Sequence, residues 1–265
     1  MGFRVQADFL LRVMTGFSVV YAVVAMAAWT FDSRTIANES VWLKPLKFGL
    51  STALYLATLC WALRCLSDAW RQGQFAWWVS VSAALCTLFE LVYIGVQAAQ
   101  GEASHFNVGT PYHAAMYGLM AVAAVLLVLC SGAIGMMAAL DIGANGSSLG
   151  RWSVALAFPL SAALTILTGL SMGGRMTHHV GVTLAGAAQV PFTGWSLRAG
   201  DLRVPHFLAM HLLQAGPLFA WVVSQGAGTG VGTAAAGVFC LLWSALTLWL
   251  LRLAREGKPL TALWG

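Results

Sequence analysis

The histidines are the residues of this sequence best suited to chemistry, and their distribution is asymmetric. They fall in or beside two connections between long apolar segments: His105, His113, His178, His179, His206 and His211. If those segments cross a membrane in turn, all of the imidazoles lie at one membrane face, which we name the histidine-rich face. Imidazole titrates near neutrality and binds transition metals, so we expect a functional site at this face.

A second group of candidates lies inside the apolar segments, where ionisable side chains are costly and usually functional. Glu90 stands near the middle of the segment 76–99, and Tyr93 and Gln97 follow at spacings that place them on one helix face. Lys47 begins a polar stripe in another segment, and we expect it to approach Glu90. The sequence therefore predicts Glu90, buried among helices, and Lys47 as the catalytic pair.

Three histidines at the ends of apolar segments are the candidate metal ligands: His113, His206 and His211. Haem iron commonly takes histidine ligands, so haem b or another transition metal ion is the predicted cofactor. On an ideal helix His206 and His211 point about 140° apart, so helix geometry alone does not let them share one metal. His211, with Gln214 three residues later, is the expected inward-facing residue, and His206 is expected at the rim.

Other polar residues near the histidine-rich face are expected to bind a substrate or the charged groups of a cofactor. This predicted set contains Arg34, Lys44, His105, Asp201, Arg203, Tyr93, Gln97 and Gln214. For Lys44, an ammonium group that extends to the lipid headgroups is the simpler expectation. We expect one pocket open to this face, lined by aromatic residues such as Trp42, Phe48 and Tyr117. The residues expected to converge on it are Lys44, Lys47, Glu90, His113, Arg203 and His211.

The elements that must position these residues are membrane spans. The chain of 265 residues is 59% hydrophobic and 9% charged, whereas an ordinary soluble domain is about 25% charged. Runs long enough to cross a hydrocarbon core of about 30 Å occur at 10–30, 46–67, 76–99, 112–140, 152–173, 206–225 and 231–253. The predicted fold is therefore all-α: a polytopic integral membrane protein with seven transmembrane helices in one bundle, as a single domain over 1–265.

An arrangement with eight spans is the alternative. It requires the segment 180–196 to cross the membrane, although Gly181, Gly186 and Pro191 interrupt it. We prefer seven spans and a folded loop there. A crossing at this point would move His206 to the opposite face. The distribution of basic residues between the two faces is more uneven with eight spans, so the positive-inside rule favours the alternative. With seven spans the basic residues favour neither orientation once those assigned to the site are set aside.

Charge and cysteine content exclude several classes of function. The net charge of +5 is spread over loops and helix ends, which is typical of contact with lipid headgroups and does not indicate nucleic-acid binding. The five cysteines form no C-x-x-C pair, which argues against a disulfide framework or a zinc ribbon.

Arg4 and Arg12 precede or enter the first apolar run and a polar loop follows it, so no cleaved signal peptide is expected. The expected partner is the lipid bilayer of the cell membrane, and a homo-oligomer is compatible with the sequence.

Two main function classes fit these observations. A membrane oxidoreductase with haem b or another metal, acting on a small or lipid-soluble substrate, explains why the polar residues gather at one face. A proton-coupled transporter or channel with Glu90 as its protonatable gate is the alternative, although its path should continue to the opposite face, which carries few polar residues. A role as an accessory membrane subunit is the third possibility.

Overall fold

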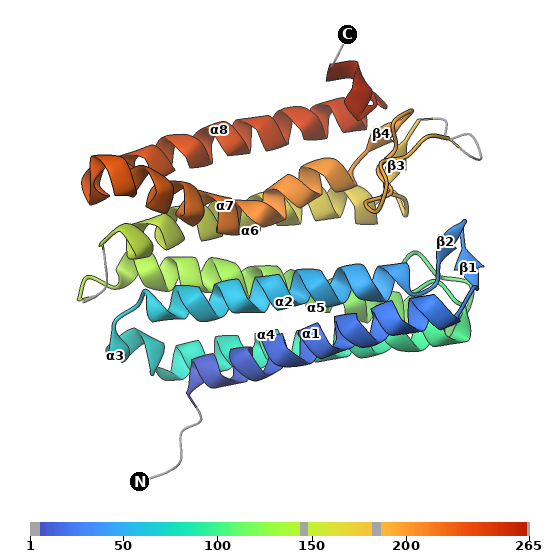
Figure 1. Cartoon of the computed structure of the whole chain (residues 1–265), viewed down its shortest axis with the longest axis horizontal. Coiled ribbons are helices and arrows are strands. Elements are labelled where there is room, and N and C mark those ends of the chain that lie inside the picture. Colours follow the sequence, from blue (N-terminus) through green and yellow to red (C-terminus); the bar gives the residue numbers. More distant parts are fainter. Residues whose placement is uncertain (1–5, 144–147, 182–186, 264–265) are drawn as a thin grey trace. The chain divides into compact units, whose positions relative to one another are not determined.

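The fold consists of long apolar helices, as the sequence predicts. The computed structural model describes residues 6–143, 148–181 and 187–263. Within these ranges seven helices are long and apolar enough to cross a membrane (Figure 1). They are α1 (Ala7–Phe31), α2 (Leu43–Arg64), α4 (Gln74–Gln100), α5 (Pro111–Leu140), α6 (Ser148–Gly173), α7 (Arg203–Ala227) and α8 (Thr229–Arg255). Each corresponds to one predicted run, so the all-α polytopic membrane fold is confirmed.

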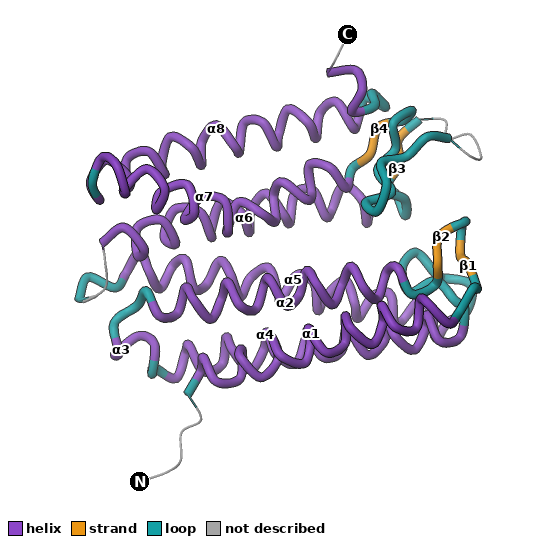
Figure 2. Tube along the Cα trace, in the orientation of Figure 1, coloured by secondary structure: helices purple, strands orange, loops and turns teal. Residues whose placement is uncertain are grey.

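Short elements lie in the connections between these helices. They are a four-residue helix α3 (Asp68–Arg71), a 3-10 helix η1 (Leu260–Leu263), and the strands β1 (Thr35–Ile36), β2 (Glu39–Ser40), β3 (His179–Val180) and β4 (Gly200–Asp201). β1 pairs with β2 and β3 pairs with β4, both antiparallel. Figure 2 shows both pairs in connections between helices. These elements are too short to have been predicted from periodicity.

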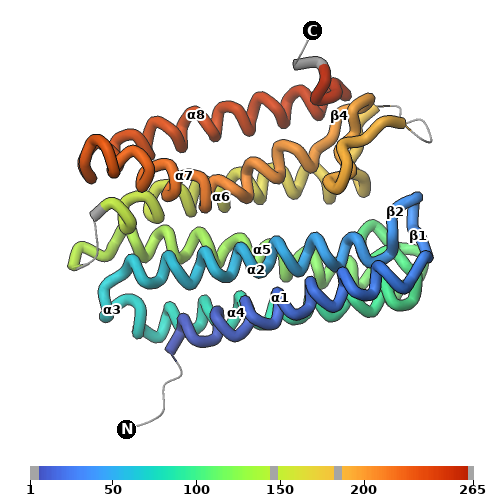
Figure 3. Tube along the Cα trace, in the orientation of Figure 1, coloured from blue at the N-terminus to red at the C-terminus, as the bar shows by residue number. Residues whose placement is uncertain are grey.

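The chain divides into two compact units. Unit 1 covers residues 1–147 and contains α1 to α5, and unit 2 covers residues 148–265 and contains α6 to α8. Figure 3 follows the chain through unit 1 in blue to green and through unit 2 in yellow-green to red. Each unit is described by itself below, and the single domain over 1–265 stays a prediction.

Close helix packing positions the candidate residues of unit 1. A Cβ atom built on Gly49 of α2 would lie 2.9 Å from the Cβ of Ala22 of α1, so only glycine allows this approach. Small residues at such crossings are typical of helices packed in a membrane. The Tyr55 hydroxyl of α2 donates to the carbonyl of Leu127 of α5, and Cys130 Sγ of α5 donates to Val79 O of α4 at 3.5 Å. These contacts join α2, α4 and α5 within unit 1.

The connection between α6 and α7 is a folded loop in the part that the structure describes. β3 and β4 close it, and an antiparallel bridge joins Gln189 to Ser196. Residues 182–186, which belong to the alternative eighth span, lie outside the described residues. The chain therefore presents seven candidate spans in its described part, as predicted, and 187–199 is not a helix.

Candidate functional site

Glu90 is buried inside unit 1, as the sequence predicts. Its exposed fraction is 4%, and its Oε1 atom has no hydrogen-bond partner among the residues that the structure describes. Four further polar residues are buried along the same helix: Ser80, Thr87, Tyr93 and Gln97. The spacings from Ser80 to Thr87 and from Glu90 to Gln97 are both seven residues, close to two helical turns. We name Ser80, Thr87, Glu90, Tyr93 and Gln97 the α4 stripe.

The hydroxyl groups of the α4 stripe differ from other buried hydroxyls of unit 1. Ser18 donates to Met14 O at 2.9 Å and Thr52 donates to Phe48 O at 2.8 Å, each one turn earlier in its own helix. This is the usual way to satisfy a hydroxyl in a membrane helix. By contrast, the hydroxyls of Ser80, Thr87 and Tyr93 have no partner among the described residues. Buried polar atoms without partners raise the free energy of the fold, and in native proteins they often mark functional positions.

The positive charge of Lys44 acts on Glu90. The sequence favoured Lys47 for this position and the lipid headgroups for Lys44. In the structure Lys47 Nζ lies 3.9 Å from Glu39 Oε2, because the β1–β2 hairpin brings Glu39 to the start of α2. Lys44 Nζ lies 6.0 Å from the centre of the Phe48 ring, and Lys44 is only partly exposed.

His105 occupies an aromatic environment in the connection between α4 and α5. Its ring centre lies 5.6 Å from that of Phe48 and 6.4 Å from that of Tyr117, and its Nδ1 lies 3.1 Å from Ser104 Oγ. Burial, together with the positive charge of Lys44, lowers the pKa of His105 to about 3. The imidazole is therefore neutral at physiological pH. Phe48 and Tyr117 thus lie beside His105, one of the predicted site residues.

His113 is held by two partners at the start of α5. Thr110 caps this helix: its hydroxyl accepts a hydrogen bond from the His113 backbone N–H at 3.2 Å and lies 2.9 Å from Nδ1. The Nε2 atom lies 2.8 Å from Glu102 Oε2, and Gln97 Nε2 donates to the same oxygen at 3.4 Å. Both ring nitrogens of His113 are therefore engaged, and a metal could bind this imidazole only after one of these contacts breaks.

Arg34 fixes the connection between α1 and α2. It forms hydrogen bonds to both carboxylate oxygens of Asp32, and its Nη1 donates to Ala99 O near the end of α4 at 3.1 Å. Trp42 Nε1 also donates to Asp32, at 2.8 Å. Hydrogen bonds from Arg34 and Trp42 hold the pKa of Asp32 well below its usual range. The described contacts of Arg34 thus position the loop.

In unit 2, Asp201 and Arg203 fasten the loop between α6 and α7. The Asp201 side chain is 2% exposed; it accepts hydrogen bonds from Arg203 Nε at 2.9 Å and from the backbone N–H of Ser196 at 2.8 Å. His179 Nε2 lies 3.5 Å from Asp201 Oδ2. Burial opposes ionisation of Asp201, but the hydrogen bonds from His179 and Arg203 outweigh it and hold the pKa of Asp201 below its usual range.

We expect Asp201→Asn to destabilise the protein by about 3 kcal/mol at neutral pH, because breaking a buried ion pair leaves a partner uncompensated. The folded-state pKa of Asp201 is depressed, so its contribution is present above the unfolded-state pKa and is lost as the pH falls through the folded value. Thermal unfolding in detergent should therefore show a gap between wild type and variant that narrows on acidification. Glu256→Gln, at an exposed carboxylate, is the control, and an equal loss of stability there would contradict the assignment.

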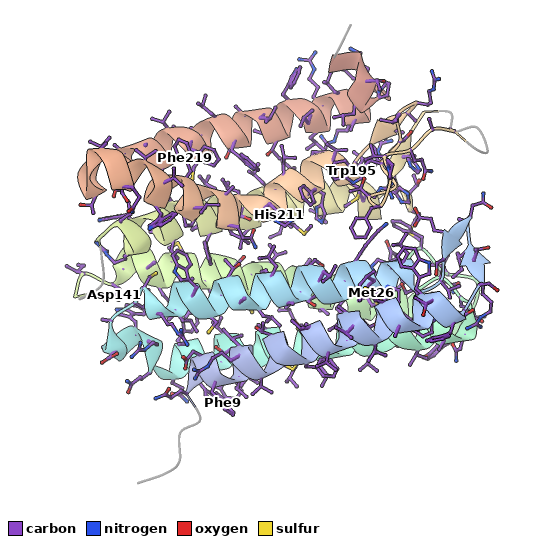
Figure 4. All side chains as sticks on the ribbon, in the orientation of Figure 1. Phe9, Met26, Asp141, Trp195, His211 and Phe219 are labelled. Atoms are coloured by element: carbon purple, nitrogen blue, oxygen red, sulfur yellow. The ribbon has the colours of Figure 1, made fainter. Side chains whose placement is uncertain are left out.

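The two histidines of α7 have different partners within unit 2. His206 Nδ1 lies 2.8 Å from Thr168 Oγ1, so His206 is the residue that contacts the neighbouring helix α6. His211 hydrogen-bonds Gln214, which was the predicted pair, and its ring centre lies 4.1 Å from that of the exposed Phe207. Figure 4 labels His211 on α7 and Trp195 in the preceding loop. These contacts describe unit 2 alone, so the inward position of His211 and the rim position of His206 stay predictions.

The predicted site residues divide between the two units. Lys44, Lys47, Glu90 and His113 belong to unit 1, and His206, His211 and Arg203 belong to unit 2. Among the residues that the structure describes, no three His, Cys, Asp or Glu side chains form a group that could hold a metal ion. The convergence of all these residues on one pocket, and the metal centre, stay predictions.

Sequence reasoning missed three residues of unit 1. Ser80 and Thr87 were not considered because small hydroxyl residues are common in membrane helices and usually bind their own backbone. The signal available in the sequence was their spacing: Ser80 and Thr87 are seven residues apart and lie on the same helix face as Glu90. Glu102 lies in a loop where an acidic residue is ordinary, and its position five residues after Gln97 was the signal for a contact across the helix end.

No family model matches this chain, and no curated protein or solved structure is significantly similar to it. The contacts within the two units are therefore the basis for assigning a function.

Proposed function

We propose that the protein conducts protons across the cell membrane, as a channel or as the proton-coupled part of a transporter, with Glu90 as the group that takes up and releases the proton. The observation that carries this proposal is the burial of Glu90 within a helix long and apolar enough to span the membrane, with Oε1 unpartnered among the described residues. An ionisable residue at such a depth is a functional candidate by default. A small molecule is the proposed coupled substrate of a transporter.

Two opposing effects allow Glu90 to change its protonation state. Removing a carboxylate from water favours the neutral form, because an unpaired buried charge is costly. The positive charge of Lys44 acts on Glu90 and favours the ionised form. A group held between these effects can bind and release a proton with a small change in free energy.

The α4 stripe supports conduction from one membrane face to the other. From Ser80 to Gln97 it extends about 26 Å along the helix, which approaches the thickness of the hydrocarbon core, about 30 Å. Ser80 and Thr87 continue the polar line on the side of Glu90 that faces away from the histidines. The sequence predicts few polar residues toward the face opposite the histidines, and this favours an oxidoreductase over a proton path. Ser80 and Thr87 weaken that argument because they add buried polar groups on this side of Glu90.

Proton flux into liposomes tests the proposal. The purified protein is reconstituted with a pH-sensitive dye inside the vesicles, and a potassium diffusion potential is imposed with valinomycin. We expect acidification or alkalinisation of the lumen well above that of protein-free liposomes, with a direction that follows the imposed potential. Flux equal to that of the protein-free vesicles would contradict the proposal.

The haem or metal oxidoreductase predicted from the histidines is tested by an absorption spectrum and metal analysis of the same preparation. For a proton-conducting protein of the kind proposed, we expect flux to persist in a colourless, metal-free preparation. A Soret band that tracks activity would instead support the oxidoreductase, because haem iron commonly takes histidine ligands.

A further inference from the structure

We infer that Glu102 and His113 form the proton entrance of this protein, collecting protons from water at one membrane face and delivering them to Glu90. This inference rests on the proposed function and adds the residues that supply its proton. It begins from the contact between His113 Nε2 and Glu102 Oε2 at 2.8 Å, at the end of the α4 stripe.

A series of polar side chains leads from solvent into unit 1, and its hydrogen bonds extend as far as Gln97. The Glu102 side chain is 45% exposed and that of His113 is 16% exposed. Gln97, which donates to Glu102 Oε2, is 1% exposed. Tyr93, one turn deeper on the same helix, is also buried, with its hydroxyl unpartnered among the described residues. The series therefore begins in water and ends one turn from Glu90.

The chemistry of the pair suits proton collection. Imidazole serves as a proton shuttle in proteins, and a carboxylate in contact with it can accept or return a proton. A proton taken from hydronium is held on the pair, and water carries it to the Glu90 carboxylate, which becomes a carboxylic acid. The pair then returns to its starting state. Gln97 and Tyr93 cannot themselves carry charge easily, so their role is to hydrogen-bond the water that does.

The other charged groups near this helix end already have partners, so we assign proton collection to His113. Arg34 contacts the end of α4 but is matched by Asp32, and Lys47 of α2 is matched by Glu39. Lys44 of α2 acts on Glu90 and on His105. His105 is the other imidazole of unit 1, and its burial keeps it neutral at physiological pH. His113 is thus the partly exposed imidazole of this helix end that contacts a carboxylate.

Chemical rescue tests the entrance. In liposomes at low buffer concentration, we expect His113→Ala and Glu102→Gln to lower proton flux at least tenfold, since a positioned acid or base typically accelerates proton transfer by about 10²–10⁴-fold. Imidazole added to the medium should restore flux in His113→Ala far more than it changes wild type, because a soluble proton carrier replaces the missing side chain. A purely structural role for His113 would not give rescue. His178→Ala and Glu256→Gln, both in unit 2, are the matched controls.

The outcomes separate the entrance from the proposed function. If Glu90→Gln abolishes flux while His113→Ala and Glu102→Gln conduct as wild type at low buffer, the entrance is wrong and the role of Glu90 stands. If Glu90→Gln conducts normally, the proposed function fails. A loss of flux in His113→Ala that imidazole does not restore also overturns the entrance, provided that His113→Gln, which keeps a hydrogen-bonding side chain, restores flux.

Discussion

Glu90→Gln is expected to reduce proton flux by at least about 100-fold. The amide of glutamine retains the shape of the carboxyl group but does not take up and release a proton in the physiological pH range. The measurement is dye-reported flux into liposomes under an imposed potential. Glu90→Asp keeps the acid but shortens the side chain, so it should retain part of the flux. Wild-type flux in Glu90→Gln would contradict the proposed function, in which Glu90 takes up and releases the proton.

Stability measurements on the same variant distinguish a functional role from a structural one. Glu90 is buried with Oε1 unpartnered among the described residues, and a carboxyl of this kind costs free energy in the folded state. Glu90→Gln should therefore unfold at the same temperature as wild type or at a higher one. A large fall in the unfolding temperature would indicate that Glu90 is needed for folding. Glu256→Gln, at an exposed carboxylate, is the matched control for both measurements.

The spans and the burial of Glu90 could be predicted because each follows from a large free-energy term. A run of about 20 apolar residues is stable across a bilayer, and an ionisable residue within it avoids lipid. Both effects depend on residue type and distance along one helix. The sequence carries that information directly, so helix α4 and the placement of Glu90 inside unit 1 agree with expectation.

The partners of the site residues could not be predicted because they depend on loop geometry. Gly101 ends α4 with a positive φ of 75°, and this turn lets the Glu102 backbone N–H donate to Gln97 O at 2.8 Å. Only then does the Glu102 side chain meet His113. In the same way, the β1–β2 hairpin turns at Ala37 and Asn38, both with positive φ. Such turns are weakly encoded, since non-glycine residues adopt this conformation rarely.

The one-sided distribution of the histidines has several local explanations within the described units. His113 contacts Glu102, His179 contacts Asp201, and His206 contacts Thr168. Each of these imidazoles satisfies a polar group at a helix end or in a loop, where the chain leaves the apolar region. The clustering of the histidines in and beside two connections of the sequence is therefore compatible with separate structural contacts and one proton-collecting pair.

Lys44→Met should lower proton flux at neutral pH about tenfold, the change expected when about 1.4 kcal/mol of electrostatic stabilisation of the Glu90 carboxylate is removed. The reason is that the charge of Lys44 acts on Glu90, so without it the neutral acid is favoured and release of the proton becomes slow. Since ionisation then requires a lower proton concentration, the pH of half-maximal flux should move upward. The measurement is flux as a function of pH in the liposome assay.

Lys47→Met is the matched control for this prediction, because Lys47 lies one turn away on the same helix and its ammonium group is near Glu39. Exposed or partly exposed ion pairs contribute little, about 0–1 kcal/mol, so we expect flux within about twofold of wild type and an unchanged pH profile. The comparison also decides between two assignments, since the sequence predicts Lys47 as the partner of Glu90 and the charge of Lys44 acts on Glu90 as well. A shifted profile in Lys47→Met with none in Lys44→Met would restore the assignment from sequence, and the electrostatic role of Lys44 would be wrong.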